Sequence, residues 1–272
     1  MHRFILGFLV LFGSSFATES PMVRVEIVPL VSEVSPGVPF DVAVIFSMKP
    51  DWHIYWQNPG EAGLATSFDW TLPDGYRMIS KHEPVPNRHV EDGITTFIHE
   101  NEAIFLFQVL PPAQLLNTDS FQVDIRWLEC NEVCRPGSHQ FGFQIPQAHE
   151  STQNIETWRD LRLKAETHFP METQAFEGQA RPKRNRVELR IPAPMTAIGK
   201  LVEADFFPFE EMIYDIGSTV LVKSRFRRTS IVIPLAGDRD HDPKRLQGVL
   251  IQKYSSSEGL VTIQSIIDTS IH

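Results

Sequence analysis

Between Met22 and about Pro146 the chain consists of short runs in which apolar and polar residues alternate. Examples with this period of two are Val23–Ile27, Phe40–Phe46 and Phe121–Trp127. Alternation of this kind is typical of strands that bury one face, and the Pro-Gly and Pro-Asp-Gly sequences between the runs favour turns. Because no helical stretch separates the runs, the pattern predicts an antiparallel β-sandwich and disfavours a parallel α/β fold.

The period changes between Ser151 and Phe169, where apolar residues recur at helical spacing. The apolar positions are Ile155, Trp158, Leu161 and Ala165, and the candidate N-caps are Ser151, Thr152 and Asn154. Because Pro170 follows as a stop, the pattern predicts one amphipathic helix. The polar and basic stretch from Gly178 to Arg186 is interpreted as a linker.

Strand-like runs resume after this stretch. They are Val187–Ile191, Val220–Val222, Ser230–Ile233 and Gly248–Ile251. The sequence therefore predicts an all-β protein with a sandwich domain over residues 18–148, a helix and linker over 149–186, and a second, smaller β domain over 187–272.

The N-terminus has the features of a secretory signal. Met1–Arg3 is basic, Phe4–Phe12 is almost wholly apolar, and Ser15-Phe16-Ala17 is a small-x-small cleavage sequence. The apolar run is much shorter than the roughly 20 residues that a membrane-spanning helix needs. We predict that residues 1–17 are a cleaved signal peptide, and that the protein is exported to the periplasm and soluble after cleavage.

The amino-acid composition limits which kinds of molecule the protein is expected to bind. The chain carries a formal net charge of -9 with a sequence pI of about 5.6, whereas phosphate backbones are bound by concentrated Lys and Arg. Nucleic acid is therefore not expected as a partner, and no cofactor is predicted. With 42% hydrophobic and 10% aromatic residues, the chain can fill two cores.

Candidate chemistry centres on the two cysteines of the chain, Cys130 and Cys134. A closely spaced pair in an exported protein tends to form a disulfide. In a straight strand such residues would be roughly 13 Å apart, beyond the roughly 7 Å limit between bridged Cα atoms. The chain must therefore curl between them, and Asn131 together with a turn at Pro136-Gly137 is expected to allow it.

Three interpretations of the pair are open at this level. A structural disulfide around so short a loop would stabilise the folded protein by only about 2 kcal/mol. Short local disulfides are often easily reduced, which suits thiol-disulfide exchange. A metal site with His139 is disfavoured, because structural zinc needs four ligands and no paired histidines lie near. Glu129 and Glu132 flank the pair, with only Arg135 opposing them, so a strongly acidic thiol is not expected.

Three motifs carry a resemblance to a known family, and a fourth is weaker. They are Asp51–Gly60 with Gly63–Thr66, Asp69–Gly75, Trp127–Gly137 and, more weakly, Glu203–Phe209. With them the chain resembles the exported N-terminal region of the thiol:disulfide interchange protein DsbD family, especially its ScsB-like branch. The resemblance covers most of the mature chain.

The resemblance implies an immunoglobulin-like domain that acts as a thiol-disulfide oxidoreductase of the protein-disulfide reductase type. Its electrons would come from a membrane-embedded thiol reductant of the DsbD or CcdA type and pass to periplasmic thioredoxin-like or disulfide-isomerase proteins. Cys134 would form the mixed disulfide with the partner, and Cys130 would resolve it. Because this sequence lacks the transmembrane and thioredoxin-like modules of the family, the electron donor is expected to be a separate protein.

The resemblance also suggests supporting residues. Family members carry a cap aromatic that shields the disulfide, for which Phe97 is the candidate here, although an ordinary core aromatic is an equal alternative. Thr95 and Thr96 stand where better-known members have acidic residues. His53 and Tyr55 share one strand face, and the resemblance would place them beside the cysteines, where the imidazole could move a proton or simply pack.

An alternative function belongs to another class of protein. Sandwich folds host many binding modules, so the chain could be a non-enzymatic periplasmic adaptor that binds a partner protein. In that case the disulfide would be a local brace. The two hypotheses differ in whether the cysteines are needed for activity.

Overall fold

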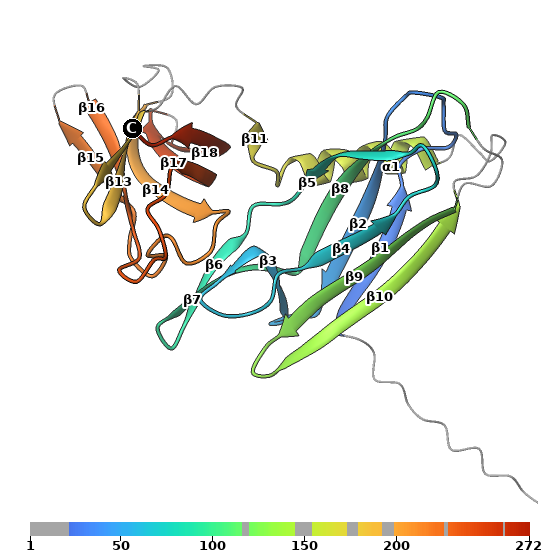
Figure 1. Cartoon of the computed structure of the whole chain (residues 1–272), viewed down its shortest axis with the longest axis horizontal. Coiled ribbons are helices and arrows are strands. Elements are labelled where there is room, and N and C mark those ends of the chain that lie inside the picture. The colour runs from blue at the N-terminus through green and yellow to red at the C-terminus, as the bar shows by residue number, and fades with distance from the viewer. Residues whose placement is uncertain are drawn as a thin grey trace, which may run out of the picture.

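The computed structural model describes residues 22–115, 120–144, 154–172, 179–191, 199–225, 228–257 and 259–272. These residues form two β domains and one helix (Figure 1), so the all-β prediction is confirmed. The predicted signal peptide, residues 1–17, lies outside them. Within the described residues, no helix has the length and apolar character that crossing a bilayer requires.

The first domain is a sandwich of two antiparallel sheets. One sheet has the order β1 (Val23–Pro29), β2 (Phe40–Met48), β8 (Glu102–Leu110) and β5 (Arg77–His82). The other has the order β10 (Cys134–Gln144), β9 (Ser120–Cys130), β3 (His53–Gly60), β7 (Ile94–Glu100) and β6 (Asn87–Glu91), with β4 (Ser67–Thr71) also beside β9. The predicted antiparallel, immunoglobulin-like sandwich is confirmed.

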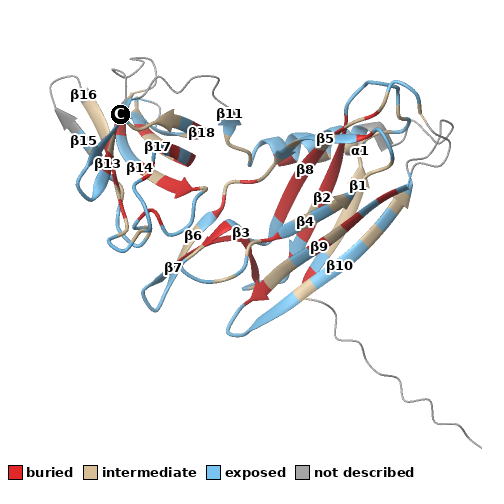
Figure 2. Cartoon of the chain, viewed as in Figure 1, coloured by how far each residue is buried: buried red, intermediate tan, exposed pale blue. Residues whose placement is uncertain are grey.

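Aromatic and β-branched residues fill the space between the sheets. Phe46 of β2 packs edge-on against Phe105 of β8 and Trp127 of β9, with ring centroids 5.6 and 5.7 Å away. Ile54 and Ile125 from the second sheet are fully buried in the same cluster. Figure 2 shows buried residues concentrated on β2 and β8 and an exposed β10. Each fully buried side chain of this size stabilises the fold by about 1.5–3 kcal/mol.

The predicted helix covers the outer face of the first sheet. It runs as α1 (Asn154–Glu166), shorter than the predicted 151–169, of which residues 151–153 lie outside the described residues. Leu161 and Ala165 pack on a buried cluster of the sheet that includes Leu106. The guanidinium of Arg162 lies 2.8 Å from the carboxylate of Asp41 on β2. Both faces of β2 are therefore largely buried.

The second domain contains two four-stranded sheets. One has the order β11 (Met171–Glu172), β18 (Gly259–Ser270), β17 (Arg245–Ser256) and β14 (Lys200–Pro208). The other has the order β12 (Gln179–Lys183), β13 (Arg186–Ile191), β16 (Arg228–Pro234) and β15 (Leu221–Arg225). Leu189, Ile231 and Leu250 are fully buried between them.

The interpretation of residues 178–186 as a linker is wrong. Gln179–Lys183 pairs with β13 along its whole length, so this sheet begins before the predicted boundary. In β12 the burial falls on Ala180, whose side chain is 1% exposed, while its neighbours are polar and exposed. A strand with one small buried residue has almost no apolar alternation, which is why the pattern did not indicate it.

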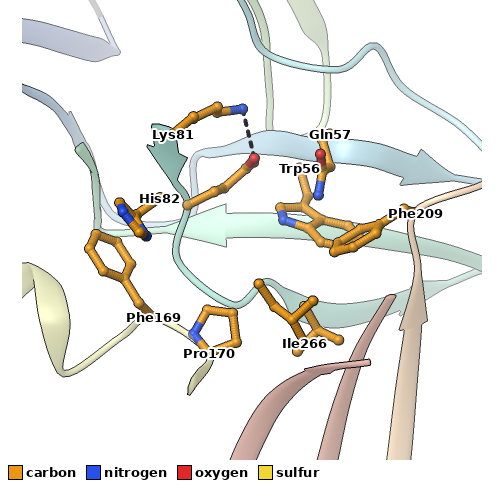
Figure 3. A pocket seen from close by; sticks show the side chains of 10 residues that line it. Trp56, Gln57, Lys81, His82, Phe169, Pro170, Phe209 and Ile266 are labelled. Atoms are coloured by element: carbon orange, nitrogen blue, oxygen red, sulfur yellow. Dashed lines mark hydrogen bonds and ion pairs between the residues drawn. The ribbon is translucent and has the colours of Figure 1, made fainter. Parts of the chain in front are cut away.

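An aromatic cluster joins the two domains. Trp56 and Phe97 of the first domain pack against Phe207 of the second, with ring centroids 6.4 and 5.0 Å from that of Phe207. Trp56 also packs against Phe209. Beside this cluster a cavity of about 200 Å³ reaches toward Phe169, as Figure 3 shows. The domains therefore share a buried apolar contact in addition to their chain connection.

We expect Phe207→Ala to destabilise the protein by about 3–5 kcal/mol, because it leaves a cavity between Trp56 and Phe97. Unfolding by urea, followed by tryptophan fluorescence, measures the change. Leu260→Ala is the control, since Leu260 is 68% exposed and should change stability by less than about 0.5 kcal/mol. Equal stability of the two variants would contradict the interdomain role of Phe207.

Candidate functional site

The two cysteines close the hairpin between β9 and β10. Cys130 is the last residue of β9 and Cys134 the first of β10, and the two are register partners. They form a disulfide with Cα atoms 4.2 Å apart, and the amide of Asn131 donates to the carbonyl of Val133. The predicted curl of the chain is therefore a tight three-residue loop.

The expected turn at Pro136-Gly137 is wrong, because both residues continue β10 and pair with β9. Among the described strands β10 is an edge strand, where a proline costs no ladder hydrogen bond. A side chain at Gly137 would overlap the indole of Trp127, which lies across the strand at this point. Trp127 Nε1 also donates to Glu129 at 3.1 Å, so this end of the hairpin is firmly packed.

The two cysteines differ in accessibility. Cys130 is 2% exposed, whereas Cys134 and the loop residues before it are exposed. In Figure 2 the end of β9 is buried and the start of β10 is exposed. An incoming thiolate therefore meets Cys134, while Cys130 is enclosed by protein.

The buried cysteine lies against strands β3 and β7. It clusters with Tyr55 and Ile98, and Leu128 packs beside them. The Tyr55 hydroxyl donates to Cys130 Sγ at 3.3 Å, and His53 Nε2 lies 3.5 Å from that hydroxyl. The structure thus brings His53 and Tyr55 to the cysteines.

The apolar residues on the other side of this segment divide between two clusters. Trp52 and Ile54 belong to the sandwich core. Trp56 contacts the second domain, where it clusters with Phe97 and Phe207.

A loop after β3 holds the Tyr55 ring in place. Gly63 has φ of 102°, a conformation that favours glycine, and the Tyr55 ring fills the space that a Cβ of Gly63 would need. The Thr66 hydroxyl donates to the Tyr55 carbonyl at 2.8 Å. The loop therefore packs against the Tyr55 ring and bonds to its backbone.

A second imidazole lies beside His53, and the sequence analysis did not identify it. The ring of His89 on β6 is 5.6 Å from that of His53. Burial lowers the pKa of His53, and the charge of His89 lowers it further, while Glu100 and Glu91 oppose the shift. Burial raises the pKa of Tyr55, with a contribution from Glu91. Near neutral pH the site therefore presents a neutral imidazole and a protonated phenol.

Phe97 does not occupy the position expected of a shield. Its side chain is 0% exposed and packs with Trp56 and Phe207 between the domains. Successive residues of a strand face opposite sides, so Ile98, which is the register partner of Tyr55, faces Cys130 instead. Phe97 is the core aromatic that the alternative interpretation described.

His139 lies on β10 with its ring 4.0 Å from that of Phe141. Among the described residues, no three His, Cys, Asp or Glu side chains are arranged to hold a metal ion.

Comparison with known proteins identifies the first domain. Residues 24–145 match the family model described as thiol:disulfide interchange protein DsbD, N-terminal. The N-terminal periplasmic domain of ScsB from Proteus mirabilis has the same fold, with a TM-score of 0.63 at 15% identity over 92% of this chain and 95% of that chain. The likeness to ScsB includes the second domain.

Two other comparisons add little. The reduced N-terminal domain of DsbD from Neisseria meningitidis aligns over 44% of this chain and 83% of that chain, at 14% identity and a TM-score of 0.31, which is too low to compare folds. The comparison with curated protein sequences gives no significant match.

Tyr55→Phe should slow reduction of the disulfide by dithiothreitol about tenfold. The hydroxyl would no longer stabilise charge that develops on Cys130 sulfur, and one such hydrogen bond contributes about 1.5 kcal/mol. Quenched-flow sampling with thiol alkylation measures the rate. Tyr214→Phe is the matched control, since it removes a buried hydroxyl that donates to the Arg245 carbonyl in the second domain. A Tyr55→Phe rate within twofold of wild type would refute the role.

Stability should fall as the pH drops below 6.5, the ordinary pKa of His53, because the folded-state pKa is lower than that value. The unfolded chain then binds the proton more readily than the folded one, and the loss continues down to the folded pKa. His53→Gln should reduce this dependence. Urea unfolding at about pH 7.5 and about pH 5.5 measures it in both proteins. Identical pH dependence would show that His53 is not buried as described.

Proposed function

Residues 24–145 belong to the family of DsbD N-terminal domains, and from this premise we propose that the chain exchanges thiols and disulfides through Cys130 and Cys134. The observation that carries the proposal is the asymmetry of the pair. Cys134 is exposed, whereas Cys130 is buried and accepts a hydrogen bond from the Tyr55 hydroxyl. A structural brace needs neither the accessible sulfur nor the donor.

Reduction begins when a thiolate of a donor dithiol attacks Cys134 Sγ. The bond between the two cysteine sulfurs breaks, and its electron pair leaves on Cys130, where the Tyr55 hydroxyl stabilises the developing charge. The second thiolate of the donor then attacks its own first sulfur and releases Cys134. The donor becomes a disulfide, and this chain gains two electrons and takes up two protons as its sulfurs become thiols.

Onward transfer reverses these roles. The Cys134 thiolate attacks a client disulfide and forms a mixed disulfide, and one client sulfur leaves as a thiolate. The Cys130 thiolate then attacks Cys134 Sγ, which restores the internal disulfide and releases the second client thiolate. Cys130 can reach only its own neighbour because it is buried, so Cys134 forms the bond to the partner.

His53 supports proton transfer in this scheme. Its Nε2 lies 3.5 Å from the Tyr55 hydroxyl, and its lowered pKa keeps the imidazole neutral near pH 7. During onward transfer the neutral imidazole can take the proton that the Cys130 thiol loses as it becomes a thiolate. During reduction the imidazolium can return a proton to the newly formed thiolate as the thiol re-forms. His53 and Tyr55 are therefore proposed as supporting residues, whereas the two cysteines carry the covalent chemistry.

The proposed setting is the periplasm. The fold match is to a domain that is periplasmic in ScsB, and the N-terminal residues have the pattern of an export signal. The proposed donor is a membrane-embedded dithiol reductant. The proposed clients are exported proteins with a thioredoxin-like or disulfide-isomerase fold.

The test is to trap the mixed disulfide. Cys130→Ser removes the resolving thiol, so we expect a covalent complex with periplasmic proteins on non-reducing gels that disappears on reduction. Cys134→Ser is the matched control, since it leaves the buried cysteine and should trap much less.

The reduction potential of the wild-type pair separates exchange from a brace. Exchange couples lie at roughly -120 to -270 mV and structural bridges below about -300 mV. A reduction potential below about -300 mV, together with no trapped complex in Cys130→Ser, would overturn the proposal and favour a binding adaptor.

A further inference from the structure

We infer that the second domain controls proton delivery to the disulfide, because it anchors Arg88 and so holds the neighbouring His89 beside His53. The inference rests on the proposed exchange at Cys130 and Cys134 and assigns the second domain a part in it. Three observations carry it: the contacts of Arg88, the alternation along β6, and the continuity of polar groups from Cys130 to the surface.

Within the described residues, two polar side chains link the redox sheet to the second domain: Asn58 of β3 donates to the Pro208 carbonyl at 2.8 Å, and Arg88 of β6 forms an ion pair. Arg88 Nε and Nη2 donate to the two carboxylate oxygens of Asp205 at 3.0 and 2.7 Å. The guanidinium also donates to the carbonyls of Ile216 and Phe206, and it lies over the rings of Phe97 and Phe207. A planar guanidinium with paired carboxylate bonds and two ring contacts has little freedom to move.

The residue after Arg88 faces the other side of the same strand. Residues of β6 alternate between faces, so the Arg88 side chain enters the second domain while His89 is directed to the disulfide side. There the His89 ring lies 5.6 Å from the His53 ring. Among the described strands, β6 is at the edge of its sheet and pairs with β7. The contact with Asp205 therefore restrains a strand that has a ladder partner on one side.

Polar groups connect the buried sulfur to solvent through this histidine. The Tyr55 hydroxyl lies 3.3 Å from Cys130 Sγ and 3.5 Å from His53 Nε2. The His89 side chain is 39% exposed, and its Nε2 lies 3.7 Å from the carboxylate of Glu91. In the proposed route a proton enters at His89, crosses the space between the two imidazole rings, whose centroids are 5.6 Å apart, to His53, and reaches Cys130 through the Tyr55 hydroxyl.

The titratable groups around His53 come from three strands. His89 and Glu91 belong to β6, Glu100 belongs to β7, and Tyr55 belongs to β3 itself. The Asn87 amide holds Glu100 at 3.3 Å. Of these groups His89 is the one whose interaction lowers the pKa of His53, so its departure would make protonation of His53 easier.

The test is an NMR titration of the His53 imidazole in the full chain. We expect Asp205→Asn to raise the pKa of His53, because β6 loosens and His89 moves away, and His89→Gln to raise it as well. Loss of a distant negative charge would by itself lower that pKa, so the sign separates positioning from direct electrostatics. Glu203→Gln is the matched control, since Glu203 lies on the same strand and pairs with Lys253 within the second domain.

The rate of reduction by glutathione, divided by the glutathione thiolate concentration, gives a second readout. In the wild type this corrected rate should vary with pH as His53 titrates, and the variation should move to higher pH in Asp205→Asn but not in Glu203→Gln. If Asp205→Asn does not fold, Arg88→Lys keeps the charge, loses the paired bonds and should give the same shift.

An unchanged His53 pKa in a folded Asp205→Asn or Arg88→Lys protein would overturn the inference, as would an unchanged pKa in His89→Gln. The titration does not depend on a protein partner. If Cys130→Ser traps no partner but the pKa of His53 shifts, the exchange function alone is rejected. If Cys130→Ser traps a partner but the pKa of His53 is unchanged, the role of the second domain alone is rejected.

Discussion

The alternation of side chains along β3, β6 and β7 is the constraint on which the site depends. These strands lie between the second domain and the disulfide. β3 and β7 contact both, whereas on β6 Arg88 contacts the second domain and His89 lies beside His53. On β7, Phe97 packs between the domains while Ile98 lies against Cys130. A register slip of one residue would exchange the two faces. The interdomain packing and the surroundings of the buried cysteine are therefore set together.

The hairpin between β9 and β10 determines how the two cysteines are presented. A hairpin loop of three residues brings them together at the end of two strands, so one cysteine is on the exposed edge strand and the other faces β3. Thioredoxin-like proteins activate a cysteine with a helix N-terminus. Here the polar environment is a phenol and two imidazoles, and burial keeps one of the imidazoles neutral near pH 7. Such a site suits an exchange partner whose reactivity depends on access to Cys134.

Burial of Arg88 at the junction is tolerated because its donors are satisfied. A partly buried guanidinium without partners would destabilise the fold, but here Asp205 and two carbonyls accept from it. The surrounding aromatic rings exclude water and strengthen these bonds. Asn58 adds a second directional contact by donating to the Pro208 carbonyl. The junction therefore combines apolar burial with directional polar contacts, which give the two domains a defined relative orientation.

Local patterns in the sequence determine many of these structural features. Strands of period two, the helix after them, the cysteine pair, and the shared face of His53 and Tyr55 all follow from residues close together in the chain. The family resemblance added the expectation that this face meets the cysteines.

Tertiary structure alone decided which strands are neighbours and therefore what each face meets. The position of His89 beside His53 and the burial of Phe97 between the domains depend on partners far away in sequence. The pairing of β12 with β13 and the continuation of β10 through Pro136 and Gly137 are contacts within hairpins, but apolar alternation did not indicate them. The alternation of apolar and polar residues predicts which side of a sheet a residue faces, but not what covers that side. The cover is set by strand register and domain packing, which depend on contacts that local periodicity does not encode.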